Sequence, residues 1–260
     1  MSPLPEAFRL DGRVAIVTGA SRGLGRSIAL ALAAAGADVA VASRSAKELA
    51  ETAGAVEALG RRGLAVPTDV TVYAQVEALV ERTAATLGRL DIVVNNSGIA
   101  AVMPLAEMPP EEFRRSLEVN LVGVFNGCRA AASRLIAQKS GKIVNLASML
   151  GAAGLAGYTA YSASKGGVIA FTRALAVEWA RHNIQVNCLV PGFIMTPLTE
   201  QGLWGNPRRS AWLLDRIPAR RPGEPGDLVG AALLLASPAS DYMTGQTVTV
   251  DGGFLAGSPW

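Results

Sequence analysis

Short runs of β-branched residues alternate with longer segments of helical periodicity along the whole chain, and this alternation limits the fold more than any other feature. Strands are predicted at 14–18, 38–43, 64–67, 91–95, 142–146, 185–189 and 247–250. Helices are predicted at 24–35, 46–59, 72–87, 110–138, 158–181 and 227–236. Strictly alternating strands and helices are typical of a parallel sheet that is covered by helices on both faces. Because we find no repeat or linker, we expect one α/β domain over residues 1–260.

The composition removes several classes of function. Half of the residues are hydrophobic and the net charge is +3, but the charges are spread out, without the basic and aromatic block that nucleic-acid binding favours. No stretch approaches the roughly 20 apolar residues of a membrane span, and the N-terminus lacks the pattern of a signal peptide. Cys128 and Cys188 lie in apolar runs, and His182 is the single histidine, so we predict no disulfide frame and no metal site. We expect a soluble, cytoplasmic protein.

A glycine-rich turn follows the first predicted strand and opens the first predicted helix. This is the context in which glycines let a pyrophosphate approach the backbone and the positive end of a helix. A glycine cluster alone is weak evidence, but its position between strand and helix strengthens it. The turn residues predicted to contact a dinucleotide are Gly19, Ser21, Arg22, Gly23, Leu24 and Gly25.

The end of the second predicted strand indicates which dinucleotide is bound. An acidic residue there would accept hydrogen bonds from a ribose 2′-hydroxyl and repel a 2′-phosphate. This chain has Ser43 and Arg44 instead, and Arg22 lies in the glycine turn, so two guanidinium groups could hold a phosphate. We therefore favour NADP(H) over NAD(H), although Arg44 could merely be solvated at a helix entry. Asp69 and Val70 follow the third strand; Asp69 could bind the adenine amino group or cap the next helix.

Tyr161 and Lys165 are four residues apart on a predicted helix, so they share one face. A tyrosine ordinarily titrates near about 10, and a neighbouring ammonium favours its phenolate form. Tyr158 is a weaker candidate, because the residue four positions later is Ser162. Taken alone, such a pair is more often a solvated helix face, because such pairs are common.

Taken together, these motifs resemble those of the short-chain dehydrogenase/reductase family over essentially the whole chain. The segments that carry the resemblance are Thr18–Gly25, Asn95-Asn96-Ser97-Gly98, the set Asn120, Ser148, Tyr161 and Lys165, Pro191-Gly192 with Thr196, the segment from Arg221 to Pro225, and Val250–Gly253. Ser97 stands where the family usually has alanine, and being small it should disturb little.

The resemblance implies a Rossmann fold, a doubly wound parallel sheet of strand order 3-2-1-4-5-6-7, and a homotetramer. It implies that Tyr161 is the acid–base, that Ser148 binds the same substrate oxygen, and that Lys165 lowers the pKa of Tyr161. Asn120 would hold a water that links Lys165 to solvent. Further cofactor contacts would come from Asn96, Gly98, Pro191, Gly192, Ile194, Thr196, Tyr161 and Lys165.

The segment 193–218 is the least regular stretch and is predicted to form a short lid over the substrate. Its apolar residues could equally pack against the domain or a neighbouring subunit. Arg208 and Arg209 could meet an anionic substrate, or could form a solvated loop face. The residues predicted to surround the substrate are Met103, Leu150, Leu155, Tyr158, Leu203, Trp204 and Trp212.

These features predict an NADP(H)-dependent oxidoreductase that transfers a hydride between nicotinamide and a carbonyl or secondary alcohol. The arginines favour a ketoreductase similar to the 3-oxoacyl-carrier-protein reductases; a sugar-acid dehydrogenase of the gluconate 5-dehydrogenase type is the alternative. A non-catalytic NADP-binding regulator is an alternative of another class, since function resides in sites and not in folds.

Overall fold

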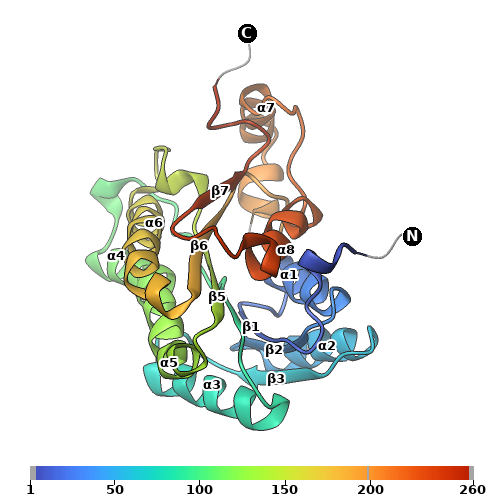
Figure 1. Ribbon diagram of the computed structural model, residues 1–260. Coiled ribbons are helices and arrows are strands. Elements are labelled where there is room, and N and C mark those ends of the chain that lie inside the picture. Colours follow the sequence, from blue (N-terminus) through green and yellow to red (C-terminus); the bar gives the residue numbers. More distant parts are fainter. Residues whose placement is uncertain (1–3, 198, 258–260) are drawn as a thin grey trace.

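Seven parallel strands form one sheet in the order β3-β2-β1-β4-β5-β6-β7, as Figure 1 shows for the computed structural model. The structure describes residues 4–197 and 199–257, so both ends of the predicted domain and one lid residue lie outside the described part. The strands are β1 Val14–Thr18, β2 Asp38–Ser43, β3 Gly63–Pro67, β4 Ile92–Asn95, β5 Gly141–Leu146, β6 Ile184–Pro191 and β7 Thr247–Val250. The order reverses between β1 and β4, and a crevice at such a switch point is where α/β sheets bind ligands. The predicted fold class and strand order are confirmed.

Helices cover both faces of this sheet (Figure 1). They are α1 Gly23–Ala34, α2 Ala46–Glu57, α3 Tyr73–Leu87, α4 Pro110–Leu117, α5 Gly123–Gln138, α6 Thr159–Trp179, α7 Pro207–Arg216 and α8 Val229–Ala236. Helices α3 to α6 lie on one face, and α1, α2 and α8 lie on the other, while α7 stands beyond the layers at one end of the sheet.

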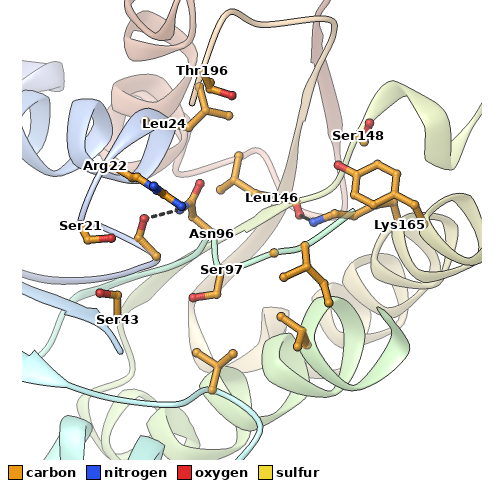
Figure 2. Close-up of a pocket in the computed structure, with 18 of the residues that line it drawn as sticks. Ser21, Arg22, Leu24, Ser43, Asn96, Ser97, Leu146, Ser148, Lys165 and Thr196 are labelled. Atoms are coloured by element: carbon orange, nitrogen blue, oxygen red, sulfur yellow. Dashed lines mark hydrogen bonds between the residues drawn. The ribbon is translucent and has the colours of Figure 1, made fainter. Parts of the chain in front are cut away.

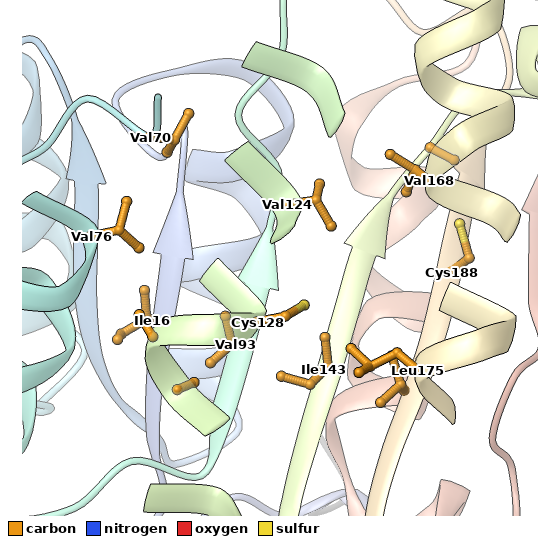
Figure 3. Packing of buried hydrophobic residues seen from close by; sticks show 14 of the residues in the cluster. Ile16, Val70, Val76, Val93, Val124, Cys128, Ile143, Val168, Leu175 and Cys188 are labelled. Carbon is orange, nitrogen blue, oxygen red and sulfur yellow. The ribbon is translucent and has the colours of Figure 1, made fainter. Parts of the chain in front are cut away.

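The strands are apolar on both faces because both faces are buried. On the side of α3 to α6, Ile16, Val93 and Ile143 project from neighbouring strands toward helical residues such as Val124 and Val168 (Figure 3). A second cluster fills the opposite face under α1, α2 and α8. Burial on both sides explains why these strands are continuous apolar runs without alternation.

Two segments differ from the sequence prediction. The predicted helix 110–138 is interrupted at Glu118–Val122 by a π-helical turn, which separates α4 from α5. The predicted irregular lid contains a π-helical turn, Glu200–Trp204, and the regular helix α7. Helix α7 begins with Pro207, and the Asn206 side chain accepts a hydrogen bond from a backbone amide of its first turn. Both features are ordinary start signals for a helix.

None of the helices described is both long and apolar enough to cross a membrane.

Candidate active site

A cavity of about 660 Å³ opens at the carboxyl ends of the central strands. It extends from the turn between β1 and α1 to the start of α6, and Figure 2 shows Arg22 and Ser43 at one end and Ser148 and Lys165 at the other. Every residue predicted to contact a cofactor lines it: Gly19, Ser21, Arg22, Gly23, Leu24, Gly25, Ser43, Arg44, Asp69, Val70, Asn96, Gly98, Tyr161, Lys165, Pro191, Gly192, Ile194 and Thr196. The geometry thus brings these residues together, while their contacts with a cofactor stay predictions.

The three glycines of the first turn are required for different reasons. Gly19 and Gly23 have φ angles of +64° and +56°, a region that favours glycine. A Cβ atom at Gly25 would lie 2.3 Å from the carbonyl oxygen of Gly19 and 2.4 Å from the Asn96 amide nitrogen. At Gly23 the nearest atom would be 3.8 Å away, on Thr196, an ordinary van der Waals distance. Gly25 therefore permits close packing of α1 on the sheet, whereas Gly23 is favoured by its positive φ angle.

Thr18 and Asn96 fasten the ends of β1 and β4 together beside this turn. The Asn96 side chain donates to the backbone oxygens of Thr18 at 2.9 Å and Gly19 at 3.2 Å. The Thr18 hydroxyl accepts from the backbone nitrogens of Asn96 at 3.0 Å and Ser97 at 3.2 Å. These bonds fix the loop that separates the two ends of the cavity.

The end of the cavity near β2 carries positive charge. Arg22 and Arg44 form no ion pair with a carboxylate among residues 4–197 and 199–257. Asp69 accepts hydrogen bonds from the Thr71 backbone nitrogen at 3.0 Å and hydroxyl at 2.8 Å. These bonds, aided by the charge of Arg44, lower the pKa of the Asp69 carboxyl. An ionised Asp69 is thereby held in a local turn, and α3 begins after Val72.

At the other end, the partly buried Tyr161 lies near Ser148. Burial raises the pKa of the Tyr161 phenol, and the nearby Ser148 hydroxyl opposes this rise. The other group that acts on the phenol is Tyr158, whose ring meets the Tyr161 ring edge-on at 6.2 Å between centroids. The lowering by Lys165 that we predicted is not found in this geometry.

The position of the Lys165 ammonium group explains why it does not lower the pKa of Tyr161. Its Nζ atom donates to the backbone oxygen of Leu146 at 2.7 Å and lies 5.8 Å from the centroid of the Tyr161 ring. Burial lowers the pKa of Lys165 from 10.5 to about 8. The lysine is therefore within reach of deprotonation near neutral pH, a property suited to proton transfer.

Asn120 lies in the π-helical turn between α4 and α5, fully buried behind the cavity wall. Its side chain accepts from the Ile99 backbone nitrogen at 2.8 Å, and it donates to the Ile99 oxygen at 2.9 Å and to the Ser164 hydroxyl at 3.0 Å. Ser164 in turn donates to the backbone oxygen of Tyr161 at 2.7 Å. Ser164 was not predicted as a site residue, yet it links Asn120 to α6. The only sequence feature that could have indicated this role is its position next to Lys165.

The residues predicted to surround the substrate do not line the cavity. Tyr158 packs against Tyr161, while Leu155, Leu203 and Trp204 pack against the core cluster on the side of α3 to α6. Leu150 is buried behind Ser148, and the Met103 backbone bonds that of Gly157. Trp212 is 40% exposed and stacks with Arg216. Their role toward a substrate stays a prediction, and Trp212, which faces solvent, fits it least.

Several lining residues were missed by the sequence prediction. They are Thr68, Thr71, Ser97, Ile99, Arg114, Arg115, Glu118, Val119, Leu146, Ala147, Pro197 and Thr199. Most are direct neighbours of predicted residues and follow from strand-end position. The four on α4 and its π-helical turn had no local signal, because only packing brings them to the cavity. No cluster of three or more potential metal ligands is found in the described residues.

Comparison with known proteins identifies the family. The family model described as enoyl-(acyl carrier protein) reductase matches residues 19–255. The 2-dehydro-3-deoxy-D-gluconate 5-dehydrogenase of Escherichia coli K12 is 45% identical over 96% of this chain and 98% of its own. The chain belongs to the short-chain dehydrogenase/reductase family. As a member of it, the protein is an oxidoreductase that acts on CH–OH and C=O groups, which confirms the predicted family and enzyme class.

Other members of the short-chain dehydrogenase/reductase family are similar to nearly the same extent. A 3-oxoacyl-[acyl-carrier-protein] reductase of Thermotoga maritima is 39% identical over 95% of this chain and 100% of its own. A crystal structure of a gluconate 5-dehydrogenase from Burkholderia cenocepacia J2315, in complex with NADP and tartrate, is 39% identical with a TM-score of 0.93, covering 97% of this chain and 98% of that one.

Proposed function

We propose that the protein is an NADP(H)-dependent oxidoreductase that interconverts a ketone and a secondary alcohol on a sugar acid. The observation that carries this is one cavity with Ser148, Tyr161 and Lys165 at one end and, at the other, Arg22 and Arg44, which form no ion pair among the described residues. The sugar-acid class is supported by the 45% identity to 2-dehydro-3-deoxy-D-gluconate 5-dehydrogenase, and the phosphorylated cofactor by the NADP-bound neighbour.

The residues present fit a phosphorylated dinucleotide. The glycine turn lines the cavity with positive φ angles at Gly19 and Gly23, and the second strand ends without a carboxylate at Ser43 and Arg44. Arg22 and Arg44 would hold the 2′-phosphate by charge-assisted hydrogen bonds. When bound, the nicotinamide ring would supply or accept the hydride.

This chain's own residues would manage the proton and the charge. Tyr161 would donate its phenolic proton to the oxygen of the reduced carbonyl, or remove that proton in the reverse direction. Ser148, which lies near the phenol, would hold the same oxygen and stabilise its developing charge. Lys165, with its lowered pKa, would return a proton toward the phenolate. Asn120 and Ser164 would hold the backbone around this relay.

The first experiment is NADPH and NADH oxidation against a panel of carbonyl compounds. The panel would span keto-sugar acids, acetoacetyl thioesters, cyclic ketones and steroids. We expect turnover of keto-sugar acids with NADPH, and a loss on the order of 10²–10⁴-fold in Tyr161→Phe with cofactor binding retained. Preference for acetoacetyl thioesters would instead support the 3-oxoacyl reductase alternative. Unchanged turnover in Tyr161→Phe would remove this tyrosine from the mechanism.

The cofactor preference has a separate test. Arg44→Asp should weaken NADPH binding and spare NADH, because a carboxylate repels the 2′-phosphate. Arg26→Asp is the matched control, since Arg26 is exposed on α1 outside the cavity. Equal changes in both affinities, or the same effect in the control, would show that Arg44 does not discriminate.

We also propose a homotetramer in the cytoplasm. Exposed apolar side chains, such as Phe125 and Val177 on helices and Tyr242 before β7, support burial between subunits. Free, buried Cys128 and Cys188 suit a reducing compartment. Light scattering coupled to size-exclusion chromatography would test the assembly, and a smaller species at micromolar concentration would contradict it.

A further inference from the structure

The threonine that opens the lid points its side chain back along the chain. Thr199 precedes the π-helical turn Glu200–Trp204, yet in the described part of the chain its hydroxyl makes no capping hydrogen bond to that turn. The hydroxyl instead lies 2.6 Å from the Ile194 backbone oxygen, 3.0 Å from the Thr196 backbone nitrogen and 3.1 Å from the Thr196 hydroxyl. All three residues line the cavity. Thr199 therefore fixes the cavity loop that precedes it and does not stabilise the turn that follows it.

The short distance to Ile194 decides where the single hydroxyl proton of Thr199 lies. A hydroxyl group donates one hydrogen bond and can accept two. Two carbonyl oxygens are within reach of this proton, that of Ile194 at 2.6 Å and that of Thr196 at 3.2 Å, and the shorter distance is the one typical of an O–H···O bond. With its proton on the Ile194 oxygen, Thr199 can only accept from Thr196. The two hydroxyls, either of which could donate by distance alone, are thereby ordered with Thr196 as the donor.

This order leaves the Thr196 hydroxyl with acceptor sites only. Its one proton is engaged by Thr199, and its oxygen makes no second hydrogen bond among residues 4–197 and 199–257. A phosphate at neutral pH presents acceptor oxygens, so it is a poor partner for such an oxygen. A ligand group that carries an N–H donor is a good partner.

Thr196 lies beside the glycine turn and next to the strand end that leads to Ser148. A Cβ atom at Gly23 would be 3.8 Å from the Thr196 Cβ, and Figure 2 shows Thr196 next to the same turn. Thr196 follows β6, where Leu189 pairs with Leu146 of β5, two residues before Ser148. A ligand that extends from the arginine end of the cavity to Ser148 would therefore pass Thr196.

We propose that Thr199 is a positioning residue that directs the acceptor oxygen of Thr196 at the carboxamide nitrogen of the nicotinamide cofactor. The inference rests on the proposed function and deepens it by naming the residue that sets the polarity of this contact. On the nicotinamide half of the cofactor, the pyrophosphate only accepts, the ribose hydroxyls both donate and accept, and the amide nitrogen only donates. An acceptor-only hydroxyl is matched to the last of these. It would fix which way the amide, and with it the ring, is turned.

The test compares Thr199→Val, which keeps the side-chain shape without the hydroxyl, with Thr199→Ser, which keeps the hydroxyl. Calorimetry would measure the binding of NADP+, of its 3-acetylpyridine analogue, in which a methyl group replaces the amide nitrogen, and of 2′,5′-ADP, which lacks nicotinamide. We expect wild type to prefer NADP+ to the analogue. In Thr199→Val the affinity for NADP+ should fall on the order of fivefold, and the preference should fall toward one, while 2′,5′-ADP binds as before. Thr199→Ser should restore the preference.

Thr52→Val is the matched control. The Thr52 hydroxyl also donates to a backbone oxygen, that of Glu48 at 3.1 Å, but it lies in α2 and is not among the lining residues. This variant should leave all three affinities unchanged. If Thr199→Val does not fold, Thr196→Val replaces it, and it should lose the same preference while it still binds 2′,5′-ADP.

The outcomes separate this inference from the proposed function. A wild type that binds NADP+ without preferring it to the analogue overturns the inference alone. An unchanged preference in Thr199→Val, or equal losses for NADP+ and 2′,5′-ADP, would also overturn it, because the residue would then have no role specific to the amide. A wild type that binds neither NADP+ nor 2′,5′-ADP overturns the proposed cofactor and the inference with it.

Discussion

Replacing the buried lysine of the active site should make the folded protein more stable while it removes activity. Lys165 is 3% exposed, and burial lowers its pKa from 10.5 to about 8. Because a tenfold change in an equilibrium constant is about 1.4 kcal/mol, this lowering corresponds to about 3 kcal/mol of destabilisation at neutral pH. Lys165→Met keeps the aliphatic stem and removes the charge.

The loss of one hydrogen bond reduces the expected gain in stability. Methionine leaves the Leu146 oxygen without the Nζ donor that now lies at 2.7 Å, which costs about 1 kcal/mol. The net expectation at pH 7, without cofactor, is that Lys165→Met raises the free energy of unfolding by about 2 kcal/mol. Its kcat should fall by orders of magnitude, because the proton relay through Tyr161 is broken.

The stability that Lys165→Met gains over wild type should depend on pH within a defined range. Below pH 8 Lys165 is protonated in both the folded and the unfolded state, so the buried charge destabilises the folded protein to its full extent. Between pH 8 and 10.5 the folded protein has released this proton and the unfolded chain still binds it, so the stability of wild type rises relative to the variant. The advantage of Lys165→Met should therefore shrink by about 3 kcal/mol across that window.

Urea unfolding followed by tryptophan fluorescence at pH 7, 8, 9 and 10 would measure this difference. The matched control is Lys47→Met, at an exposed position of α2, which should change stability by less than about 0.5 kcal/mol at every pH. A variant less stable than wild type at pH 7, or a difference that does not vary with pH, would refute the reasoning about the buried charge.

Other substitutions test the packing around the site. Gly25→Ala should destabilise by at least about 1–3 kcal/mol, because its Cβ would lie 2.4 Å from the Asn96 amide nitrogen; Gly54→Ala, which meets no atom within 4 Å in α2, should stabilise slightly in the same urea titration. Ser164→Ala should lower kcat more than it changes the Kd for NADPH, since it frees the Asn120 side chain without touching the cavity, and equal losses in both would contradict a positioning role. Thr18→Val should weaken NADPH binding in a titration by loosening Asn96, and unchanged affinity would argue against that link.

The fold and the cofactor half of the cavity could be predicted because their signals are local in sequence. Each predicted contact near Gly19, Ser43 or Pro191 lies at or just beyond the end of a strand, and the ends of parallel strands meet at one edge of the sheet. Once the strand order is known, such residues are neighbours without further information. That explains why all of them line one cavity.

The substrate half could not be predicted because it depends on packing between distant elements. Arg114 and Arg115 reach the cavity only through the position of α4, and the π-helical turn at Asn120 leaves no periodic signature. The lid helix was missed although Asn206 and Pro207 signal its start, because a stretch rich in Pro, Gly and Trp was interpreted as irregular. The pKa of Tyr161 was misjudged for a related reason: spacing along a helix does not tell how deeply a phenol is buried.

The cations at the two ends of the cavity have opposite physical settings, and the contrast bears on function. Lys165 is buried with a neutral partner, so it costs stability and loses its proton easily. Arg22 and Arg44 are exposed at the other end of the cavity and form no ion pair within the described residues. A group that must exchange protons benefits from a pKa near neutrality, whereas a phosphate is held best by the planar donor fork of a guanidinium. The proposed proton relay by Lys165 and the proposed phosphate binding by Arg22 and Arg44 agree with this difference in environment.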